Sequence, residues 1–492
     1  MVIRRSRRAS SLRRLGVVLT ALVAGLLGLT LSGVMSATGQ SLPAPTPQAV
    51  CGPGAHPETD IQGRVPQADY DSGRIKQDYR CNTEKVAHEG TTGGFKVIRY
   101  RDAQGHVCAF YDSTLLFPKD ALFNAGTGLG VVVLDMTDPT HPRRTTTLQT
   151  PAMDTPHESV LLNKKRGILG AVSGNPATAP GVLDLYDVKT DCQHPALLSS
   201  TPSAILGHES GFAPDGKTFY ASSTGGQTLV AIDITDPTAP QQVFQQFGVN
   251  YHGMRVSADG RTLYVANIGN DSTGARFANG GLRILDVSEI QDRVANPQVR
   301  IIKDLSWPEV SIPQVPEPFT RNGRQYLLEV DEYANYSFTS ADQTSAPVGA
   351  ARIIDVTDPT KAHVVSDLRL QVHQPAARKG PEKNDPGANI PVQGYAGHYC
   401  SVPTRDNPQV VACSMILSGL RIFDISDLRN PVEAGYYNKV LPSNRPENPT
   451  ASGAFAMSQP AWDVARRSVW YTDGNSGFYV VRLTNGVGKL LD

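Results

Sequence analysis

The chain has 492 residues, of which 45 are glycine, 36 are proline and 19% are charged. Lysine and arginine together number 46, as do aspartate and glutamate, so no net positive field would draw the folded part to nucleic acid. Many turn-forming residues between short apolar runs indicate an all-β protein, and we expect one closed unit rather than several domains.

Residues 1–40 have the composition of an export signal. Several arginines, the last of them Arg14, precede an uncharged apolar run from Leu15 to Leu31, and small residues follow, so cleavage is expected between Ser36 and Gln40. An uncleaved anchor is the alternative, because a run of about 17 residues is at the lower limit for spanning a bilayer. In both cases the protein is predicted to be secreted or attached to the cell envelope, with membrane contact only through this segment if it is uncleaved.

Residues 41–80 are rich in Pro, Gln, Asp and Gly and lack periodicity, which predicts an extended tether or strap. Asn82 to Glu89 has the pattern of a strand, but it has no partner within its own unit. The last unit of the chain, which ends at Leu483, has only three strands. We therefore expect the N-terminal strand to complete the last sheet and so to leave no exposed edge.

A short apolar run closed by aspartate and a polar turn recurs along the chain. Clear copies read VVVLDMTDPT from Val131, TLVAIDITDPT from Thr228 and ARIIDVTDPT from Ala351. Such a run predicts a buried strand, and Asp with Pro predicts the turn, because Asp bonds its own backbone two residues on and Pro presets φ. The equivalent positions are Asp135, Asp187, Asp233, Asp286, Asp355, Asp424 and Arg482.

The spacing of these positions, about 46 to 69 residues, allows roughly four short strands in each unit. One such unit cannot bury both of its faces, whereas seven arranged radially can. We therefore predict an all-β, seven-bladed β-propeller over residues 81–483, closed by the N-terminal strand, with residues 484–492 as a C-terminal tail. The strand–turn signature resembles the LVIVD repeat of exported bacterial and archaeal proteins over roughly Asn82 to Leu483, and this resemblance implies a β-propeller without implying a single activity.

Export makes disulfide bonds possible, and the chain has six cysteines. Six cysteines allow 15 connectivities, between which a sequence cannot choose. One pair is favoured, because Cys400 and Cys413 fall on consecutive predicted strands and could face each other.

Four of the 11 histidines occupy one position of the repeat, at the start of the predicted innermost strand. These are His157, His208, His252 and His398. The innermost strands of a propeller line its central channel, so the four imidazole rings are expected to converge near the mouth of that channel.

Neutral imidazole binds transition metals, so the four histidines predict a metal site for copper or zinc. Glu158 and Glu209 each follow one of the histidines and would act as further ligands or hold the rings in place, and Glu317 would add a carboxylate from the fifth unit. The alternative is structural: each histidine donates a hydrogen bond to a neighbouring strand, and duplication of the repeat explains its recurrence. The sequence leaves both interpretations open.

The acidic residues Glu329, Asp331 and Glu332 are expected to form a solvated strand end, because their spacing does not match a calcium loop. Three long insertions, Gly269–Gly280, Tyr333–Gly349 and Val372–Gly397, are either binding loops or segments without a role.

Two hypotheses on function follow. The first is an exported, monomeric binding module that recognises a protein, glycan or small molecule through one face of the ring. The second is a propeller enzyme with a histidine-bound metal in its channel. At the level of the fold it would resemble copper-dependent oxidases of sulfur compounds and metal-dependent lactonases. The chain has no nucleophile elbow or phosphate-binding loop.

Overall fold

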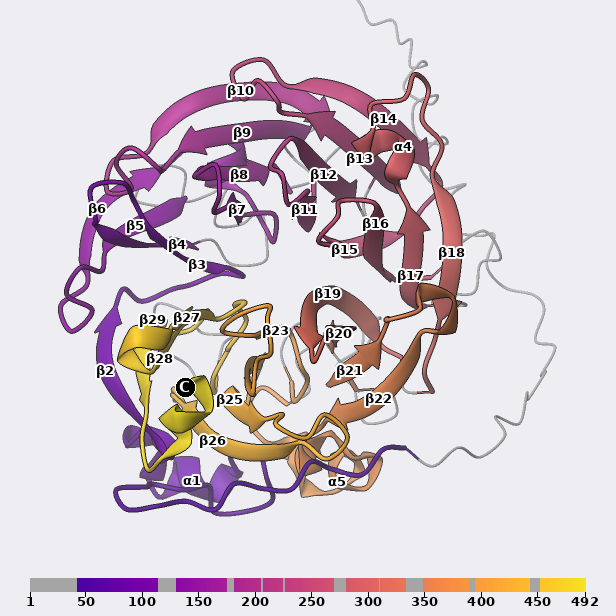
Figure 1. Ribbon diagram of the computed structural model, residues 1–492. Coiled ribbons are helices and arrows are strands. Elements are labelled where there is room, and N and C mark those ends of the chain that lie inside the picture. Colours follow the sequence, from indigo (N-terminus) through magenta and orange to yellow (C-terminus); the bar gives the residue numbers. More distant parts are fainter. Residues whose placement is uncertain are drawn as a thin grey trace, which may run out of the picture. The chain divides into compact units, whose positions relative to one another are not determined.

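Seven antiparallel sheets are arranged as the blades of a β-propeller, which confirms the predicted fold class (Figure 1). This computed structural model describes residues 42–113, 130–174, 181–204, 207–223, 226–269, 280–308, 310–332, 348–388, 394–442 and 452–492. Most of the predicted insertions Gly269–Gly280 and Tyr333–Gly349 lies outside these ranges.

Blades 1 to 4 follow the chain from the innermost strand outward. Blade 1 is β3 (Val97–Arg101), β4 (Val107–Asp112), β5 (Val131–Asp135) and β6 (Arg143–Leu148), and blade 2 is β7 (Leu161–Asn163), β8 (Ile168–Val172), β9 (Gly181–Asp187) and β10 (Ala196–Ala204). Blade 3 is β11 (Ser210–Phe212), β12 (Thr218–Ser223), β13 (Thr228–Asp233) and β14 (Gln241–Phe247), and blade 4 is β15 (Tyr251–Val256), β16 (Thr262–Asn267), β17 (Gly281–Asp286) and β18 (Arg300–Leu305).

The last three blades use the same order, and two of them gain a strand from the N-terminal part of the chain. Blade 5 is β19 (Ile312–Arg321), β20 (Arg324–Glu332), β21 (Ala351–Asp355) and β22 (His363–Leu368). Blade 6 is β23 (Tyr399–Ser401), β24 (Val410–Met415), β25 (Gly419–Asp424) and β26 (Val432–Asn438), to which β1 (Tyr79–Cys81) adds a fifth strand. Blade 7 is β27 (Ala461–Asp463), β28 (Ser468–Asp473), β29 (Gly477–Leu483) and β2 (Thr83–Glu89).

The pairing of β2 with β29 closes the ring as predicted. Thr83 lies opposite Leu483 and Glu89 lies opposite Phe478 in an antiparallel register. The first and last parts of the folded chain therefore share one blade.

The repeated aspartates make the turns predicted for them. The Oδ1 atom of Asp135 accepts a hydrogen bond from the backbone N–H of Thr137 at 3.0 Å, and Asp355 does the same with Thr357 at 2.9 Å. The aspartate thus ends the third strand of its blade and reverses the chain into the outer strand.

The helices of the described ranges are all short. They are α1 (Gln67–Asp71), η1 (Arg74–Lys76), α3 (Pro151–Asp154), α4 (Ser288–Gln291), η4 (Pro359–Lys361), η5 (Gln371–His373), α5 (Pro375–Lys379), η6 (Pro381–Asn384), η7 (Val464–Arg466) and η8 (Val487–Leu491). The described part of the insertion Val372–Gly397 thus contains α5 and η6. Within the described ranges, no helix has the length and apolar character that a membrane crossing requires.

Residues 42–81, which we call the strap, lie along the outside of blades 5 and 6 (Figure 1, indigo). The N–H of Thr46 donates to the carbonyl of Arg369 at 2.8 Å, and buried Arg421 of blade 6 pairs with Glu58 of the strap. A disulfide bond between Cys51 and Cys81 closes the strap on itself. The strap is therefore part of the folded unit.

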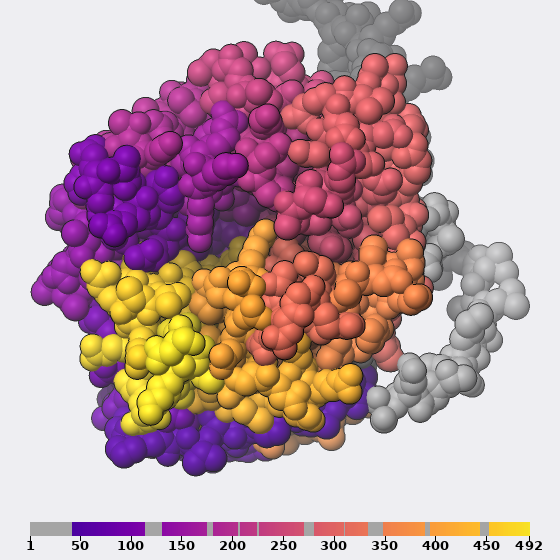
Figure 2. All heavy atoms as spheres, in the orientation of Figure 1, coloured from indigo at the N-terminus to yellow at the C-terminus, as the bar shows by residue number. Residues whose placement is uncertain are grey.

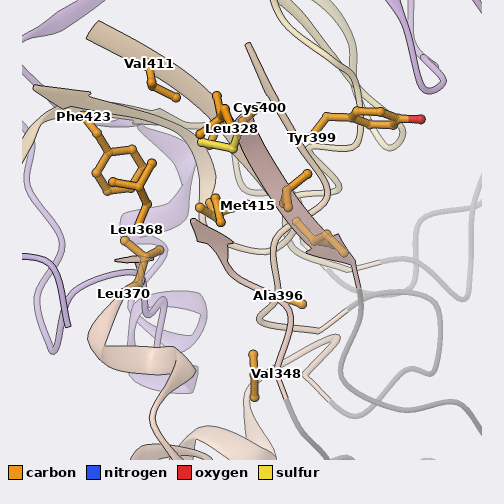
Figure 3. Close-up of a cluster of buried hydrophobic side chains, with 14 of the residues drawn as sticks. Leu328, Val348, Leu368, Leu370, Ala396, Tyr399, Cys400, Val411, Met415 and Phe423 are labelled. Atoms are coloured by element: carbon orange, nitrogen blue, oxygen red, sulfur yellow. A yellow bond between two sulfur atoms is a disulfide. The ribbon is translucent and has the colours of Figure 1, made fainter. Parts of the chain in front are cut away.

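Each blade packs on the next through apolar side chains. Between blades 5 and 6, Leu328 and Leu368 belong to the same buried cluster as Val411 and Phe423 (Figure 3). The disulfide bond Cys400–Cys413 joins β23 to β24 in the same region. A third disulfide, Cys108–Cys192, joins blades 1 and 2.

The innermost strands run in the same direction around the channel. Isolated parallel bridges link Lys96, just before β3, to Gln459, just before β27, and Thr320 of β19 to Asp406, beyond β23. The first residues of all innermost strands therefore meet at one end of the channel, and their last residues meet at the other.

Candidate metal centre

The four predicted histidines lie at the end of the channel where the innermost strands begin. His157 precedes β7, His208 precedes β11, His252 lies in β15 and His398 precedes β23. The ring centroids of His157 and His208 are 4.3 Å apart, and those of His208 and His252 are 4.5 Å apart. The repeat position thus brings the rings together, as the sequence predicted.

The carboxylate of Glu158 lies between three of these rings. Its Oε2 atom is 3.2 Å from Nε2 of His208 and 3.1 Å from Nε2 of His252. Its Oε1 atom is 3.4 Å from Nε2 of His398. Since the glutamate side chain is buried, these contacts form away from bulk water.

Blade 5 has no histidine at this position and contributes two other side chains. The carboxylate of Glu332 lies 2.9 Å from Nε2 of His398 and 3.6 Å from Nε2 of His252. The amide of Gln314 donates to Oε1 of Glu158 at 2.7 Å. We call the following residues the His–Glu cluster: Glu158, His208, His252, Glu332 and His398.

Glu332 was not predicted, and the expectation of a solvated acidic strand end was wrong. Glu329, Asp331 and Glu332 are all buried, and Arg352 pairs with both Glu329 and Asp331. The Asn322–Gly323 turn was a partial signal: counting outward from it pairs Glu332 with Pro313, and a one-residue register shift between Pro313 and Val315 moves the partner to Ile312. The end of β20 therefore lies beside the start of β19, at the histidine end of the channel.

Two of the histidines are oriented by backbone carbonyls of the following blade. Nδ1 of His252 lies 2.8 Å from the carbonyl oxygen of Pro313, and Nδ1 of His398 contacts the carbonyl oxygen of Met457. A carbonyl oxygen only accepts hydrogen bonds, so each Nδ1 carries a hydrogen and each Nε2 faces the carboxylates. This hydrogen-bonding pattern is typical of histidines that bind metals through Nε2.

The cluster shifts the pKa values of Glu158, His252 and His398. Burial opposes the charged forms, but interactions with His252 and His208 outweigh it and hold the pKa of the Glu158 carboxyl well below its usual value. In the same way Glu158 and Glu332 outweigh burial and raise the pKa of His398 to about 9. The pKa of His252 is also raised, by the same two carboxylates. The cluster therefore favours positive charge between its carboxylates.

His157 differs from the other three histidines. Its ring packs against Phe95 at a centroid distance of 4.8 Å, and burial, reinforced by the charge of His208, lowers its pKa to about 3. A nitrogen of His157 lies within 4.8 Å of donor atoms of Glu158 and His208. Its backbone has φ of +50°, a conformation that is uncommon outside glycine.

The structure does not bring Glu209 and Glu317 to this cluster. The carboxylate of Glu209 contacts Lys96 and accepts a hydrogen bond from Tyr399 at 2.7 Å, and Arg255 lies 3.0 Å from it. The carboxylate of Glu317 lies 2.8 Å from Arg255. We call Lys96, Glu209, Arg255 and Tyr399 the mid-channel ion cluster.

Asp102, His106 and Asp191 form another group of ligand-type side chains near the Cys108–Cys192 disulfide. The carboxylate of Asp102 already accepts hydrogen bonds from the N–H groups of His106 and Cys192. These contacts explain the group as a structural turn.

The donor atoms of the His–Glu cluster suit a divalent transition metal. Ligand atoms bound at about 2.0 to 2.2 Å lie roughly 3 to 3.5 Å from one another, and the separations of 2.9 to 3.6 Å between imidazole nitrogens and carboxylate oxygens match this spacing. Two buried carboxylates also match the charge of one divalent cation.

Comparisons with known proteins agree with the propeller fold and leave the activity open. A family model of the LVIVD repeat matches residues 417–439, which include β25 and β26 of blade 6. The protein is thus a β-propeller that carries an LVIVD repeat. No curated protein matches the chain in sequence.

The similar solved structures have diverse names. The β-propeller domain of Cps50 (Swd1) from Myceliophteria thermophila has 12% identity and a TM-score of 0.49, covering 82% of this chain and 100% of that one. Hydrazine synthase from Kuenenia stuttgartiensis has 13% identity and a TM-score of 0.47, covering 80% and 97%. A 6-phosphogluconolactonase candidate from Bacteroides fragilis has 10% identity and a TM-score of 0.45, covering 72% and 90%. With TM-scores below 0.5, these likenesses carry no argument about this chain.

Proposed function

We propose that the protein is an exported metal-binding β-propeller that holds one divalent transition metal ion, copper or zinc, at the histidine end of its channel. The Nε2 atoms of His208, His252 and His398 and the carboxylates of Glu158 and Glu332 would bind it. The observation that carries the proposal is the hydrogen bonding of His252 and His398, whose Nδ1 atoms are held by carbonyls while their Nε2 atoms face two buried carboxylates.

The structural and metal-binding interpretations of the histidines use different ring nitrogens. Nδ1 of His252 links blade 4 to blade 5, and Nδ1 of His398 links blade 6 to blade 7. Nε2 of each ring then faces the carboxylates of Glu158 and Glu332, where the metal would bind. A bound metal would supply a Lewis acid that polarises a small molecule or lowers the pKa of bound water, while His252 and His398, fixed by their carbonyl partners, keep their orientation.

Export is supported by the arginine-rich and apolar N-terminal segment and by three disulfide bonds with no free cysteine among the described residues. The mass of the protein recovered from an exporting host tests this part. A chain that begins between Ser36 and Gln40 is expected, whereas a full-length, membrane-bound chain would favour the uncleaved anchor.

Elemental analysis of the purified protein tests the metal site. The protein, incubated with Cu²⁺ or Zn²⁺ and desalted, is expected to retain about one equivalent of one of them, and the double variant Glu158→Gln/His252→Gln is expected to retain none. The matched control is His141→Gln, because this histidine is exposed, with 84% of its side chain accessible. Less than a tenth of an equivalent of either metal in correctly folded protein would refute the proposal.

A further inference from the structure

A pocket of about 490 Å³ opens at the other end of the channel, away from the His–Glu cluster. All seven innermost strands, or the residues next to them, contribute to its wall, from Val97–Arg99 in blade 1 to Gln459–Trp462 in blade 7. The face that carries the C-terminal residues is visibly hollowed at the centre of the ring (Figure 2). The volume lies within the range of small-ligand sites, about 300 to 1,000 Å³.

Cationic side chains dominate the polar part of this pocket. Its lining includes five of them, Arg99, Lys164, Lys165, Arg255 and Arg405, and one carboxylate, that of Glu317. The propeller fold itself does not require these five cations around one pocket, because they come from different blades.

The single carboxylate of the lining is already paired. Glu317 lies 2.8 Å from Nε of Arg255 and 2.9 Å from an Nη atom of Arg405. Arg99 has a partner just outside the lining, Asp463, at 3.2 Å. The pocket therefore keeps an excess of positive charge after its ion pairs are formed.

The excess resides chiefly on two adjacent lysines. Lys164 and Lys165 form no ion pair within the described ranges of the chain, and both side chains are exposed. The charged groups that act on Lys164 are Arg405, Glu317 and Arg99, and two of these three are cations.

The uncharged part of the wall is mixed, with the polar side chains of Asn163, Ser401, Thr404 and Gln459 beside apolar ones. Val160, Leu162, Phe212, Val402 and Trp462 line the pocket between the charged residues. A site with this composition suits a ligand that has both an anionic group and an apolar body, because the cations would bind the first and the wall would bury the second.

The mid-channel ion cluster separates this pocket from the metal centre. Arg255 lines the pocket and lies 3.0 Å from the carboxylate of Glu209, which also contacts Lys96. The side chains of Lys96 and Glu209 are 1% and 0% exposed, so the channel is closed at this level. A ligand of the pocket would therefore bind independently of a metal ion at the other end.

We infer that this pocket is a binding site for a small organic anion, a carboxylate or a phosphate monoester, held by Lys164, Lys165 and the neighbouring arginines. The acidic group would lie among the cations and the apolar body against Phe212 and Trp462. The inference does not depend on the metal proposal, because the two sites share no residue.

Calorimetric titration of the whole exported protein with matched aromatic probes tests the inference. Benzoate represents the carboxylates and phenyl phosphate the phosphate monoesters, with benzyl alcohol as the neutral probe and inorganic phosphate as the anion without an apolar body. At least one of the two organic anions is expected to bind at least about tenfold more tightly than either control, and more weakly as salt is added. The better of the two identifies the class.

The variant Lys164→Gln/Lys165→Gln is expected to weaken binding of the better probe by about tenfold or more. The control Lys361→Gln/Lys489→Gln removes two lysines outside the pocket and should bind as the wild type does. The inference would be overturned if benzyl alcohol or inorganic phosphate bound as tightly as the better organic anion. It would also be overturned by an unchanged affinity in the Lys164→Gln/Lys165→Gln variant, or if no probe bound at about 10 mM. Treatment with a chelator should leave the affinity unchanged.

Discussion

The Nε2 atoms of His208 and His252 lie 2.6 Å apart, and both are within 3.2 Å of the same oxygen of Glu158. Two imidazole lone pairs cannot face each other at this distance without repulsion, so a proton on one of the two nitrogens lies between them. The Nδ1 of His252 is already used by the carbonyl of Pro313, so Nε2 is the ring nitrogen that faces the two carboxylates and would bind a metal.

Replacing His252 by Asn should therefore weaken metal binding by about 100-fold or more, because loss of a direct ligand exceeds the 10- to 100-fold typical of an outer hydrogen-bond partner. Competition against a chelator of known affinity measures the change. His88→Asn is the matched control, since His88 contacts the carbonyl of Ser476 in blade 7 and lies outside the His–Glu cluster. Equal losses in both variants would show that the effect is on folding.

The repeat made the fold and the histidine positions predictable, because each blade repeats the same strand order and the same register. It did not predict which glutamates would join the histidines. Glu158 and Glu209 both follow a histidine at the same repeat position, but successive side chains of an extended chain point to opposite sides. Glu209 accordingly faces Lys96 in the mid-channel ion cluster.

Glu158 escapes this alternation because His157 adopts φ of +50°. The left-handed residue reorients the chain so that Glu158 faces the same site as the following histidines. No residue of the Pro156–Ser159 segment is a glycine, so the sequence carried no sign of this conformation. Glu332 was harder to predict than the histidines, because the seven units have no common residue type at the end of the second strand and only the Asn322–Gly323 turn indicated its place beside the start of β19.

The backbone conformation of His157 should matter more than its ring. Glycine adopts positive φ without steric cost, whereas a β-branched residue does not. We therefore expect His157→Gly to keep most of the metal affinity and His157→Val to lose it, because only the valine would turn Glu158 away. Chelator competition on both variants measures this, and a loss in His157→Gly equal to that in His157→Val would instead make the His157 ring a ligand.

Gln314 should tune metal affinity without being a ligand. Its amide donates to Oε1 of Glu158 at 2.7 Å and so fixes the carboxylate. Substitution by Met keeps the volume and removes the donor, so a 10- to 100-fold loss of affinity is expected, roughly as for other outer partners of metal ligands. The stoichiometry at saturating metal should remain unchanged. A loss of stoichiometry would mean that Gln314 binds the ion directly.

The mid-channel ion cluster should contribute to stability rather than to ligand binding at the His–Glu cluster. Glu209→Ala leaves the fully buried Lys96 without its main partner, and removing one member of a buried ion pair costs about 3 to 5 kcal/mol. Urea unfolding measures the loss. Lys96→Met combined with Glu209→Gln should recover part of it, since the variant buries no unpaired charge.

An exposed ion pair provides the contrast. Asp358 pairs with Lys361 at 3.0 Å, and the lysine side chain is 81% exposed. Lys361→Ala should therefore leave the urea unfolding midpoint nearly unchanged. A similar loss for Lys361→Ala and Glu209→Ala would argue against a special role for the buried pair.

Asp112 should make the stability of the protein depend on pH. Its side chain is fully buried at the end of β4, and although Oδ1 accepts a hydrogen bond from the N–H of Phe95 at 2.7 Å, Oδ2 has no hydrogen-bond partner among the residues that the structure describes. Burial raises the pKa of Asp112 to about 8, and hydrogen bonds from the N–H groups of Phe95 and Lys96 offset only part of this rise.

The folded protein therefore holds a proton on Asp112 more tightly than the unfolded chain, whose aspartate pKa is about 3.9. The stability that this proton contributes is fully present below pH 4 and is lost as the pH rises to 8. Asp112→Asn keeps the acceptor for Phe95 and cannot ionise. The melting temperatures of the variant and the wild type should be closer to each other near pH 5 than at pH 8.5. At pH 8.5 the variant should be the more stable protein. Thermal unfolding of both proteins from pH 5 to pH 9 measures the difference, and parallel curves would show that Asp112 stays in one protonation state across this range.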